Sequence, residues 1–296
     1  MLIQPQFEFQ NRIEGLSELP PIPAILFPLL TQLDECAGES DLQKIVQLVS
    51  HDSAIASQVI HMANSPLFGM LGKVSSLREA SIALGISRLR DIVTSCCLMQ
   101  ISPKGSSFDV ASFWEHCLAC ALISRSLARK LKYRDPERAY LAGLMHDLGI
   151  LVNMLVIPKE FAKVFKTAAA SRRPLRDVEL ELIGFSHEVT GDMLSSRWQL
   201  FDYLTETMRC HHNVEKATLD PTLTAIVSIA DMICRTSGLG YGYEESLQLT
   251  LQDELAWKIL SPQCPSVQTL DVVGFTSETE TYVKEVRNLI SVLFRV

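Results

Sequence analysis

Histidine and aspartate residues recur at wide intervals between residues 116 and 231, and their side chains are suited to binding metal ions. The residues concerned are His116, His146, Asp147, His187, His211, His212 and Asp231. Imidazole combined with carboxylate is a donor set that suits Fe, Mn or Zn, whereas Mg and Ca prefer oxygen ligands alone. Two adjacent histidines and an aspartate able to bridge could hold two ions about 3.5–4 Å apart. The residue types therefore predict a site for one or two divalent transition-metal ions.

The spacing of these residues indicates how they would meet. The gaps between them are 30, 1, 40, 24, 1 and 19 residues. No local metal-binding motif has such gaps, but a helical bundle produces them when each successive helix delivers one residue, or one pair, into a common core. The sequence therefore predicts that distant helices converge on a single polar centre.

The predicted helices turn these residues inward. His116 precedes Cys120 and Ile123 by four and seven residues, which puts it on the apolar face of its helix. His187 follows Ile183 by four residues and shares an apolar face in the same way. A single histidine on an apolar face is more often a hydrogen-bonded core residue than a ligand, so a decayed core without an ion is the alternative. Because inward-facing histidines recur on successive predicted helices, the pattern favours a metal site.

Small residues and an isolated carboxylate complete the pattern. His146 shares its face with Gly143 and Gly149, which leave room either for a ligand sphere or for close approach of another backbone. Asp231 lies one turn from Val227, at the edge of an otherwise apolar helix. An unpaired buried charge is prohibitively costly, so a carboxylate in such a core needs a partner, which a divalent ion would supply.

The elements that position these residues are predicted to be helices throughout. Apolar residues recur with helical periodicity, and the alternation typical of strands is nearly absent. Helix starts are marked by Asp52, by Ser76 with Glu79 three residues later, and by the pairs Asp135-Pro136 and Asp220-Pro221. The predicted fold class is all-α.

Two polar or glycine-rich stretches divide the chain into three predicted parts. An N-terminal helical subdomain spans residues 1–105, a helical core that carries the histidine series spans 106–237, and a C-terminal helical extension spans 238–296. The first boundary follows from the polar stretch at 102–109. The second follows from the GLGYGY loop at 238–243, which we expect to be a flexible linker.

Composition limits the classes of protein to consider. The 296 residues are 47% hydrophobic and 21% charged, and their net charge is −7, the opposite sign to that of a general nucleic-acid or anionic-membrane binder. No secretory signal is visible, and the most apolar stretch, 141–157, is interrupted by His146 and Asp147. We expect a cytoplasmic protein without a membrane span, and we expect its eight cysteines to be reduced.

Several segments resemble a known family. His146-Asp147, within LAGLMHDLGI, resembles the signature of the HD superfamily of metal-dependent phosphohydrolases. The HDOD family (HD-related output domain) of bacterial signalling proteins is indicated by LPPIP at 19–23, HDSAIASQVIHMANSPLFG at 51–69, SSLREASIALGISRLRDIV at 75–93, FWEHCLA around His116 and GFSHEVTG around His187. The resemblance covers about residues 16–236.

The resemblance implies an all-helical fold in which the N-terminal subdomain packs on an HD-like core. It implies a regulatory or output module that acts by binding a signalling protein, such as a kinase or response regulator. A nucleotide-type ligand is a further candidate, and the sequence does not predict an oligomeric state. Carried over position by position, the HD metal pattern falls on the same seven residues as the histidine and aspartate series.

This chain departs from related cyclic-di-GMP phosphodiesterases of the HD-GYP type at three places. Ile150 stands where those enzymes have a lysine, Ser112 replaces a metal-ligating glutamate, and the sequence after His212 lacks the Gly-Tyr-Pro signature. The lysine would neutralise phosphate charge, and its loss removes a transition-state contact. A metal site without that contact favours a structural or sensing role.

A metal-dependent phosphohydrolase acting on a cyclic nucleotide or another phosphoester is the alternative function. In that case Asp147 would be the catalytic carboxylate, and a neighbouring histidine would protonate the leaving oxygen.

Three further motifs have ordinary structural interpretations. The segment 78–93 resembles a helix-turn-helix with its turn at Gly85, and Arg88 and Arg90 could contact phosphates, but the acidic chain favours packing over nucleic-acid binding. The Cys117-Cys120 pair has the spacing of a redox or zinc pair, but it lies on a predicted helix and is expected to pack in the core. Arg172 and Arg173 are expected in a solvated loop, or in contact with an anion.

Overall fold

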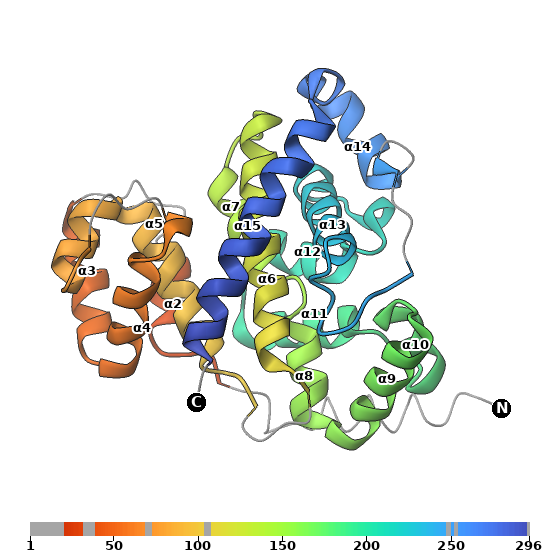
Figure 1. Cartoon of the computed structure of the whole chain (residues 1–296), viewed down its shortest axis with the longest axis horizontal. Helices are drawn as coiled ribbons and strands as arrows, with labels where there is room; N and C mark the ends of the chain where they lie inside the picture. The colour runs from red at the N-terminus through yellow and green to blue at the C-terminus, as the bar shows by residue number, and fades with distance from the viewer. Residues whose placement is uncertain are drawn as a thin grey trace. The chain divides into compact units, whose positions relative to one another are not determined.

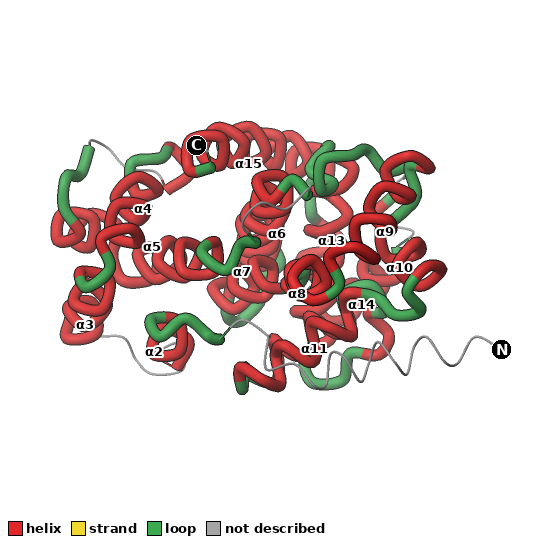
Figure 2. The backbone as a smooth tube through the Cα atoms, turned by 90° about the horizontal axis from the view of Figure 1, so that it is seen from below, coloured by secondary structure: helices red, strands yellow, loops and turns green. Residues whose placement is uncertain are grey.

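The computed structural model describes residues 21–31, 39–68, 73–103, 108–246, 250–251 and 254–294. Within these residues every regular element is a helix, as Figure 2 shows, so the predicted all-α fold class is confirmed. The chain separates into two compact units. Pro103–Val283 belongs to the larger unit, and Pro21–Ser102 belongs to the smaller unit together with the chain from Lys284 onward. The division at residues 105 and 237 stays a prediction.

The smaller unit is built from short helices and one long, kinked helix (Figure 1). Its elements are α2 (Leu26–Thr31), α3 (Glu39–Ser50), α4 (Ser53–Ala63), η1 (Pro66–Phe68) and α5 (Leu77–Met99), with the last part of α15 (Val272–Leu293). The predicted caps form. Asp52 accepts hydrogen bonds from the backbone N–H groups of Ala54 and Ile55, and Ser76 accepts one from Glu79.

The helix-turn-helix resemblance corresponds to a kink in α5. Gly85 adopts φ 73° and ψ 174°, so the helix breaks at the predicted turn, in a backbone region that glycine tolerates best. Arg88 donates from Nη1 to the carbonyl oxygen of Phe68 at 2.8 Å, and Arg90 is only 8% exposed. Both guanidinium groups that might have contacted phosphate therefore serve the packing of this unit.

The larger unit contains most of the helices. They are α6 (Val110–Lys130), α7 (Pro136–Met145), α8 (Leu148–Val156), α9 (Pro158–Ser171), α10 (Leu175–Leu182), α11 (His187–Trp198), α12 (Asp202–Cys210), η2 (Val214–Lys216), α13 (Pro221–Thr236), α14 (Leu255–Gln263), η4 (Pro265–Thr269) and the first part of α15. Asp135 and Asp220 cap α7 and α13, each followed by proline in the first turn, as predicted. Helix α6 packs against α7 and α13, and α8 packs against α11.

Two glycines allow these helices to approach closely. A Cβ atom on Gly149 would lie 1.9 Å from the carbonyl oxygen of His187, which begins α11. A Cβ on Gly143 would lie 2.9 Å from the carbonyl oxygen of Cys120 on α6. Of the two roles that the sequence left open for these glycines, the structure therefore selects close backbone approach.

One described stretch, Pro136–Val156, is long and apolar enough to meet the length and composition criterion for a membrane span, although no span was predicted from the sequence. Its most apolar window has a mean hydropathy of 1.5, and 89% of that window is buried inside the protein. The stretch comprises α7 and α8 with the break between them, so its position in the core of the larger unit accounts for its apolar character.

Candidate metal centre

The seven residues singled out by type and spacing come together inside the larger unit. One group comprises Asp147, His187, His211 and His212, and the other comprises His116, His146 and Asp231. Within each group, one potential ligand atom from every residue lies within 4.8 Å of the others. The convergence that the gaps predicted is therefore present in the structure, whereas binding of a metal by these residues stays a prediction.

The residues of the centre come both from the ends of helices and from the interior of helices. His146 is the residue directly after α7 and Asp147 the residue directly before α8, so the pair lies at the break between two helices. His187 is the first residue of α11, and His211 caps the C-terminus of α12. His116 lies within α6, where the predicted apolar face is buried.

The Asp147 carboxylate connects the two groups. Its Oδ1 lies 3.2 Å from His187 Nε2 and 3.3 Å from His211 Nε2. Its Oδ2 lies 3.1 Å from His146 Nε2 and 3.4 Å from His116 Nε2. Each oxygen of one fully buried carboxylate thus faces a pair of imidazoles, which is the arrangement expected of a carboxylate that bridges two ions.

Hydrogen bonds at the outer ring nitrogens set the orientation of the imidazoles. His116 Nδ1 lies 2.6 Å from the carbonyl oxygen of Leu239, and His146 Nδ1 lies 2.8 Å from that of Gly143. His211 Nδ1 lies 3.2 Å from the carbonyl oxygen of Thr207. Because a carbonyl oxygen only accepts, each of these Nδ1 atoms donates, and in the neutral ring the lone pair on Nε2 points toward Asp147.

His187 is oriented in the same way by a carboxylate. Its Nδ1 donates to Glu179 Oε2 at 2.6 Å, and its backbone N–H donates to the same oxygen at 3.0 Å. Glu179, on α10, is fully buried and also accepts from the side-chain amide of Asn153. A carboxylate behind a ligating histidine is the usual support in metal sites, because it holds the tautomer and raises ligand basicity.

Several buried acceptors at the centre lack a hydrogen-bond partner. They include Asp147 Oδ1, Asp231 Oδ1, His187 Nε2 and His211 Nε2. Orphaned acceptors that face one another are costly to bury, and either protons or a cation must lie between them. The donor set therefore fits a divalent transition-metal ion on chemical grounds.

The electrostatics of the centre favour a positive charge. Burial disfavours the charged imidazole, but the Asp147 carboxylate holds the pKa of His146 well above its usual range. The same opposition applies to His187, whose pKa is raised by Glu179 and Asp147. Burial raises the pKa of Asp147, yet His146 and His187 hold it well below its usual range. Metal binding requires neutral imidazoles, so an incoming ion must displace protons from this centre.

Asp231 is enclosed within the centre. It is 1% exposed, because α6 and Arg235 cover it, and both supply the partners expected for a carboxylate in the core. Its Oδ1 lies 3.3 Å from His116 Nε2, and its Oδ2 accepts from Arg235 Nη1 at 3.2 Å. Burial raises its pKa, but Arg235 and His116 hold it well below the usual value.

His212 lies at the rim of the centre. Its side chain is 14% exposed, and its Nδ1 lies 3.8 Å from Asp231 Oδ2. Burial and the neighbouring His211 lower its pKa well below the usual value, so this imidazole is held neutral and remains available as a ligand.

Comparison with known proteins identifies the family. The HDOD domain model matches residues 19–214. The chain belongs to the HDOD domain family. The resemblance noted from the motifs is therefore confirmed.

Solved structures share the fold of this HDOD chain. An HDOD domain protein of unknown function from Geobacter sulfurreducens is 25% identical, with a TM-score of 0.85 over 99% of this chain and 98% of that one. A Shewanella amazonensis protein provisionally named a phosphohydrolase is 22% identical, with a TM-score of 0.69 over 95% of this chain and 97% of that one. A Marinobacter aquaeolei protein provisionally named a signal transduction protein is 21% identical, with a TM-score of 0.73 over 98% of this chain and 65% of that one.

A sequence relative from Treponema pallidum, itself uncharacterized, is 23% identical over 224 residues. The matched region is 75% of this HDOD chain but 43% of that protein, so the chain spans less than half the length of its relative.

Three residues of the centre were not expected from the sequence: Glu179, Arg235 and Tyr241. Tyr241 is 2% exposed, donates from its hydroxyl to Asp147 Oδ2 and lies 3.3 Å from His116 Nε2. It belongs to the glycine-rich loop that we expected to be a flexible linker, which is incorrect, because the loop residues Leu239 and Tyr241 are buried against the centre. Glu179 had a detectable signal, since it shares the apolar face of Leu175 and Ile183.

Two other motifs do not take part in the centre. Cys117 and Cys120 are fully buried free thiols, and burial raises the pKa of both, which favours packing over redox chemistry. Arg172 pairs with Glu244 at 2.9 Å and Arg173 pairs with Glu181 at 2.6 Å, so protein carboxylates take the place of the suggested anion.

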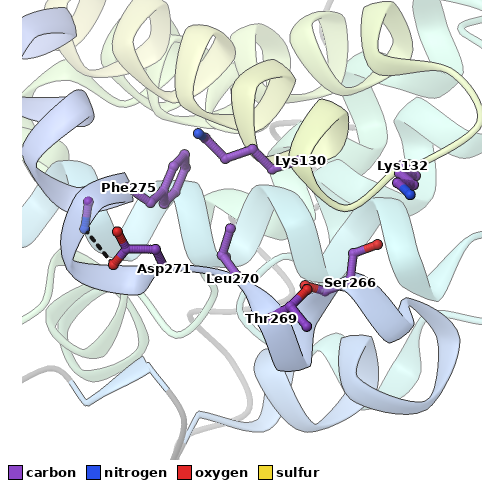
Figure 3. Close-up of a pocket in the computed structure, with 8 residues that line it drawn as sticks. Lys130, Lys132, Ser266, Thr269, Leu270, Asp271 and Phe275 are labelled. Carbon is purple, nitrogen blue, oxygen red and sulfur yellow. Dashed lines mark hydrogen bonds between the residues drawn. The ribbon is translucent and has the colours of Figure 1, made fainter.

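A separate cavity of about 500 Å³ lies between the end of α6 and the start of α15 (Figure 3). Lys130, Lys132, Ser266, Thr269 and Phe275 are among the residues that line it. The Lys130 ammonium pairs with Glu278 at 2.8 Å and lies 5.7 Å from the centre of the Phe275 ring. None of the seven predicted metal ligands lines this cavity.

Proposed function

We propose that this HDOD chain is a signal-transduction module that holds one or two divalent ions, Fe, Mn or Zn, in its core and acts by binding another signalling protein. The observation that carries the proposal is a donor set with orphaned acceptors in which every residue except His212 is at most 1% exposed. An enzyme must admit a substrate to its reacting atoms, whereas a structural or sensing ion needs only ligands.

The residues that would hold the ions follow from the two groups. His116, His146 and Asp231 would bind one ion, His187, His211 and His212 would bind the other, and Asp147 would bridge. When bound, the ions would neutralise the facing acceptors and join α6, α11, α12 and α13 through their side chains. Metal occupancy would thereby be coupled to the packing of the larger unit.

Among the described residues, the guanidinium that contacts the centre is already paired and is not free for a phosphate group. Arg235 is the guanidinium nearest to Asp231, and it is paired with Asp231 and with Glu245, to which its Nε donates at 2.9 Å. Ile150, at the position of the lysine in the resembling phosphodiesterases, is fully buried within α8. These two observations support a module that retains the ligands without a phosphate-binding cation.

The partner of this module would be a sensor kinase or a response regulator. The proposal draws on the family and on the fold shared with the Marinobacter protein provisionally named for signal transduction. A nucleotide-type small molecule is the alternative partner, and in that case its binding, in place of a signalling protein, would regulate the module.

A metal-dependent phosphohydrolase is the second candidate function. It is favoured by one observation, the placement of both Asp147 oxygens between pairs of imidazoles, since bridged pairs of ions are used in phosphoester hydrolysis. In that case Asp147 would be the catalytic carboxylate and a histidine would donate the proton to the leaving oxygen.

Elemental analysis of tag-free protein purified without chelator tests the proposal. We expect one or two equivalents of a transition metal in the native chain, and a loss of that metal in His146→Ala and Asp147→Ala. The same preparations are then assayed against cyclic dinucleotides, nucleotides and model phosphodiesters with Mn²⁺ or Fe²⁺. Absence of metal from the native chain would overturn the proposal, and hydrolysis abolished by Asp147→Ala would replace it with the second candidate.

A further inference from the structure

The hydroxyl of Tyr241 lies among the donor atoms of one half of the metal centre. It contacts Asp147 Oδ2 and lies 3.3 Å from His116 Nε2. His116 Nε2 lies 3.3 Å from both His146 Nε2 and Asp231 Oδ1. Atoms that bind one ion at about 2.0–2.2 Å lie roughly 3 Å from one another. The phenol oxygen is therefore spaced from His116 Nε2 as a second ligand of the same ion would be.

We propose that Tyr241 is itself a metal ligand, whose phenolate oxygen binds the ion held by His116, His146 and Asp231 and closes that position to phosphate and other external anions. The inference rests on the metal centre of the proposed function and deepens it. On metal binding the O–H bond of the phenol breaks, its proton passes to solvent, and an oxygen–metal bond forms.

The backbone of the loop holds the ring in this position. Gly238 and Gly242, on either side of Tyr241, have φ values of 77° and 86°, and Tyr241 itself has φ 50°. A tyrosine in the left-handed region is uncommon and persists where its surroundings over-determine it. The Leu239 carbonyl in the same loop accepts from His116 Nδ1 at 2.6 Å, so one loop orients a histidine ligand and delivers the phenol.

The far end of the loop is fastened away from the centre. Tyr243 donates from its hydroxyl to the carbonyl oxygen of Arg173 at 3.0 Å, and the Ser246 N–H donates to that of Arg172 at 2.8 Å. The loop is therefore held at both ends, and Tyr241 is not a side chain that happens to fold over an open site. Tyr282 on α15 provides a control tyrosine, because its hydroxyl donates to Glu278 Oε1 at 3.2 Å and takes no part in this loop.

Iron loading of the full chain tests the proposal by spectroscopy. Metal-free protein is loaded with Fe²⁺ and oxidised in air, and the visible absorption and resonance Raman spectra are recorded. We expect a phenolate-to-iron charge-transfer band with tyrosinate vibrations in the native chain and in Tyr282→Phe. We expect the band to be absent from Tyr241→Phe at the same iron content. Bound iron without the band in the native chain, or a band that persists in Tyr241→Phe, would overturn the inference.

Azide, an external anion that gives its own charge-transfer band with iron, tests whether the position is closed. We expect azide to bind Tyr241→Phe at least tenfold more tightly than the native chain (about 1.4 kcal/mol). Equal azide affinity would contradict the inference. Failure of the native chain to bind any metal would remove the proposed function as well, whereas bound iron without tyrosinate bands removes only the role of Tyr241. If Tyr241→Phe does not fold, the Raman spectrum of the native chain decides alone.

Discussion

Two buried carboxylates in the larger unit have opposite surroundings. Glu206 on α12 is 1% exposed, and it accepts backbone N–H donors from Thr218 at 2.6 Å, Leu219 at 2.8 Å and Asp220 at 2.7 Å. Asp147 is just as buried, but apart from the Tyr241 hydroxyl it faces imidazole Nε2 atoms, which in the neutral rings are acceptors because Nδ1 is the donor.

The difference separates a carboxylate that stabilises the fold from one prepared for a ligand. The charge of Glu206 is balanced by donors within the chain, and these donors hold the turn that precedes α13. The charge of Asp147 and the lone pairs around it are balanced only when protons or a cation enter. The comparison predicts that metal affects stability through Asp147, and that pH affects it through Glu206 without any metal.

Removal of metal should have the largest effect. A ligand present at about a thousandfold its dissociation constant stabilises the folded chain by roughly 4 kcal/mol. We therefore expect chelation to lower the thermal midpoint of the native protein, and re-addition of metal to restore it, as measured by calorimetry. Asp147→Asn should not respond to chelator or to metal. If the native protein contains metal and its thermal midpoint does not change on chelation, the predicted effect of metal on stability through Asp147 is wrong.

Glu206→Gln should have the next largest effect, about 2–3 kcal/mol at neutral pH, because charge-assisted hydrogen bonds to backbone donors are lost. Burial raises the pKa of Glu206, but the N–H groups of Asp220, Leu219 and Thr218 lower it below the ordinary value of 4.5. The stabilisation by the ionised group is therefore present above pH 4.5 and lost as the pH falls through the folded-state pKa.

Urea denaturation of both proteins across this pH range measures the effect. The gap in unfolding free energy between native chain and Glu206→Gln should close as the pH falls, with and without chelator. A gap that is independent of pH would show that the charge of Glu206 contributes nothing.

Glu179→Gln should have the smallest effect, a 10- to 100-fold loss of metal affinity with the fold retained. Support of a ligating histidine by a carboxylate has this magnitude, and Glu179 holds His187 through both its ring and its backbone N–H. Competition with a chromophoric chelator measures the affinity. Glu181→Gln on the same helix is the control, because its carboxylate is half-exposed and pairs only with Arg173 at the surface. Equal metal affinities of the two variants would show that Glu179 does not support the metal centre.

Features that depend on nearby residues were predictable. The caps at Asp52, Ser76, Asp135 and Asp220 formed as expected, because a capping side chain bonds to N–H groups two or three residues away. The inward direction of His116 and His187 followed from their spacing to apolar residues on the same helix.

Features that depend on distant contacts were not predictable. The Tyr241 hydroxyl meets a carboxylate 94 residues earlier, and Leu239 meets an imidazole 123 residues earlier. A glycine-rich loop has no periodicity that would reveal such contacts, so its sequence predicted a linker.

The amino-acid sequence alone determined the all-helical fold, the HDOD membership and the histidine and aspartate residues that meet in the core, because periodicity, motifs and residue types can be recognised locally along the chain. Only the tertiary structure decided that Asp147 presents one oxygen to each pair of imidazoles, that Glu179 holds His187, and that Tyr241 encloses the centre. Those decisions concern distances between segments far apart in the chain, and such distances are set by how the helices pack.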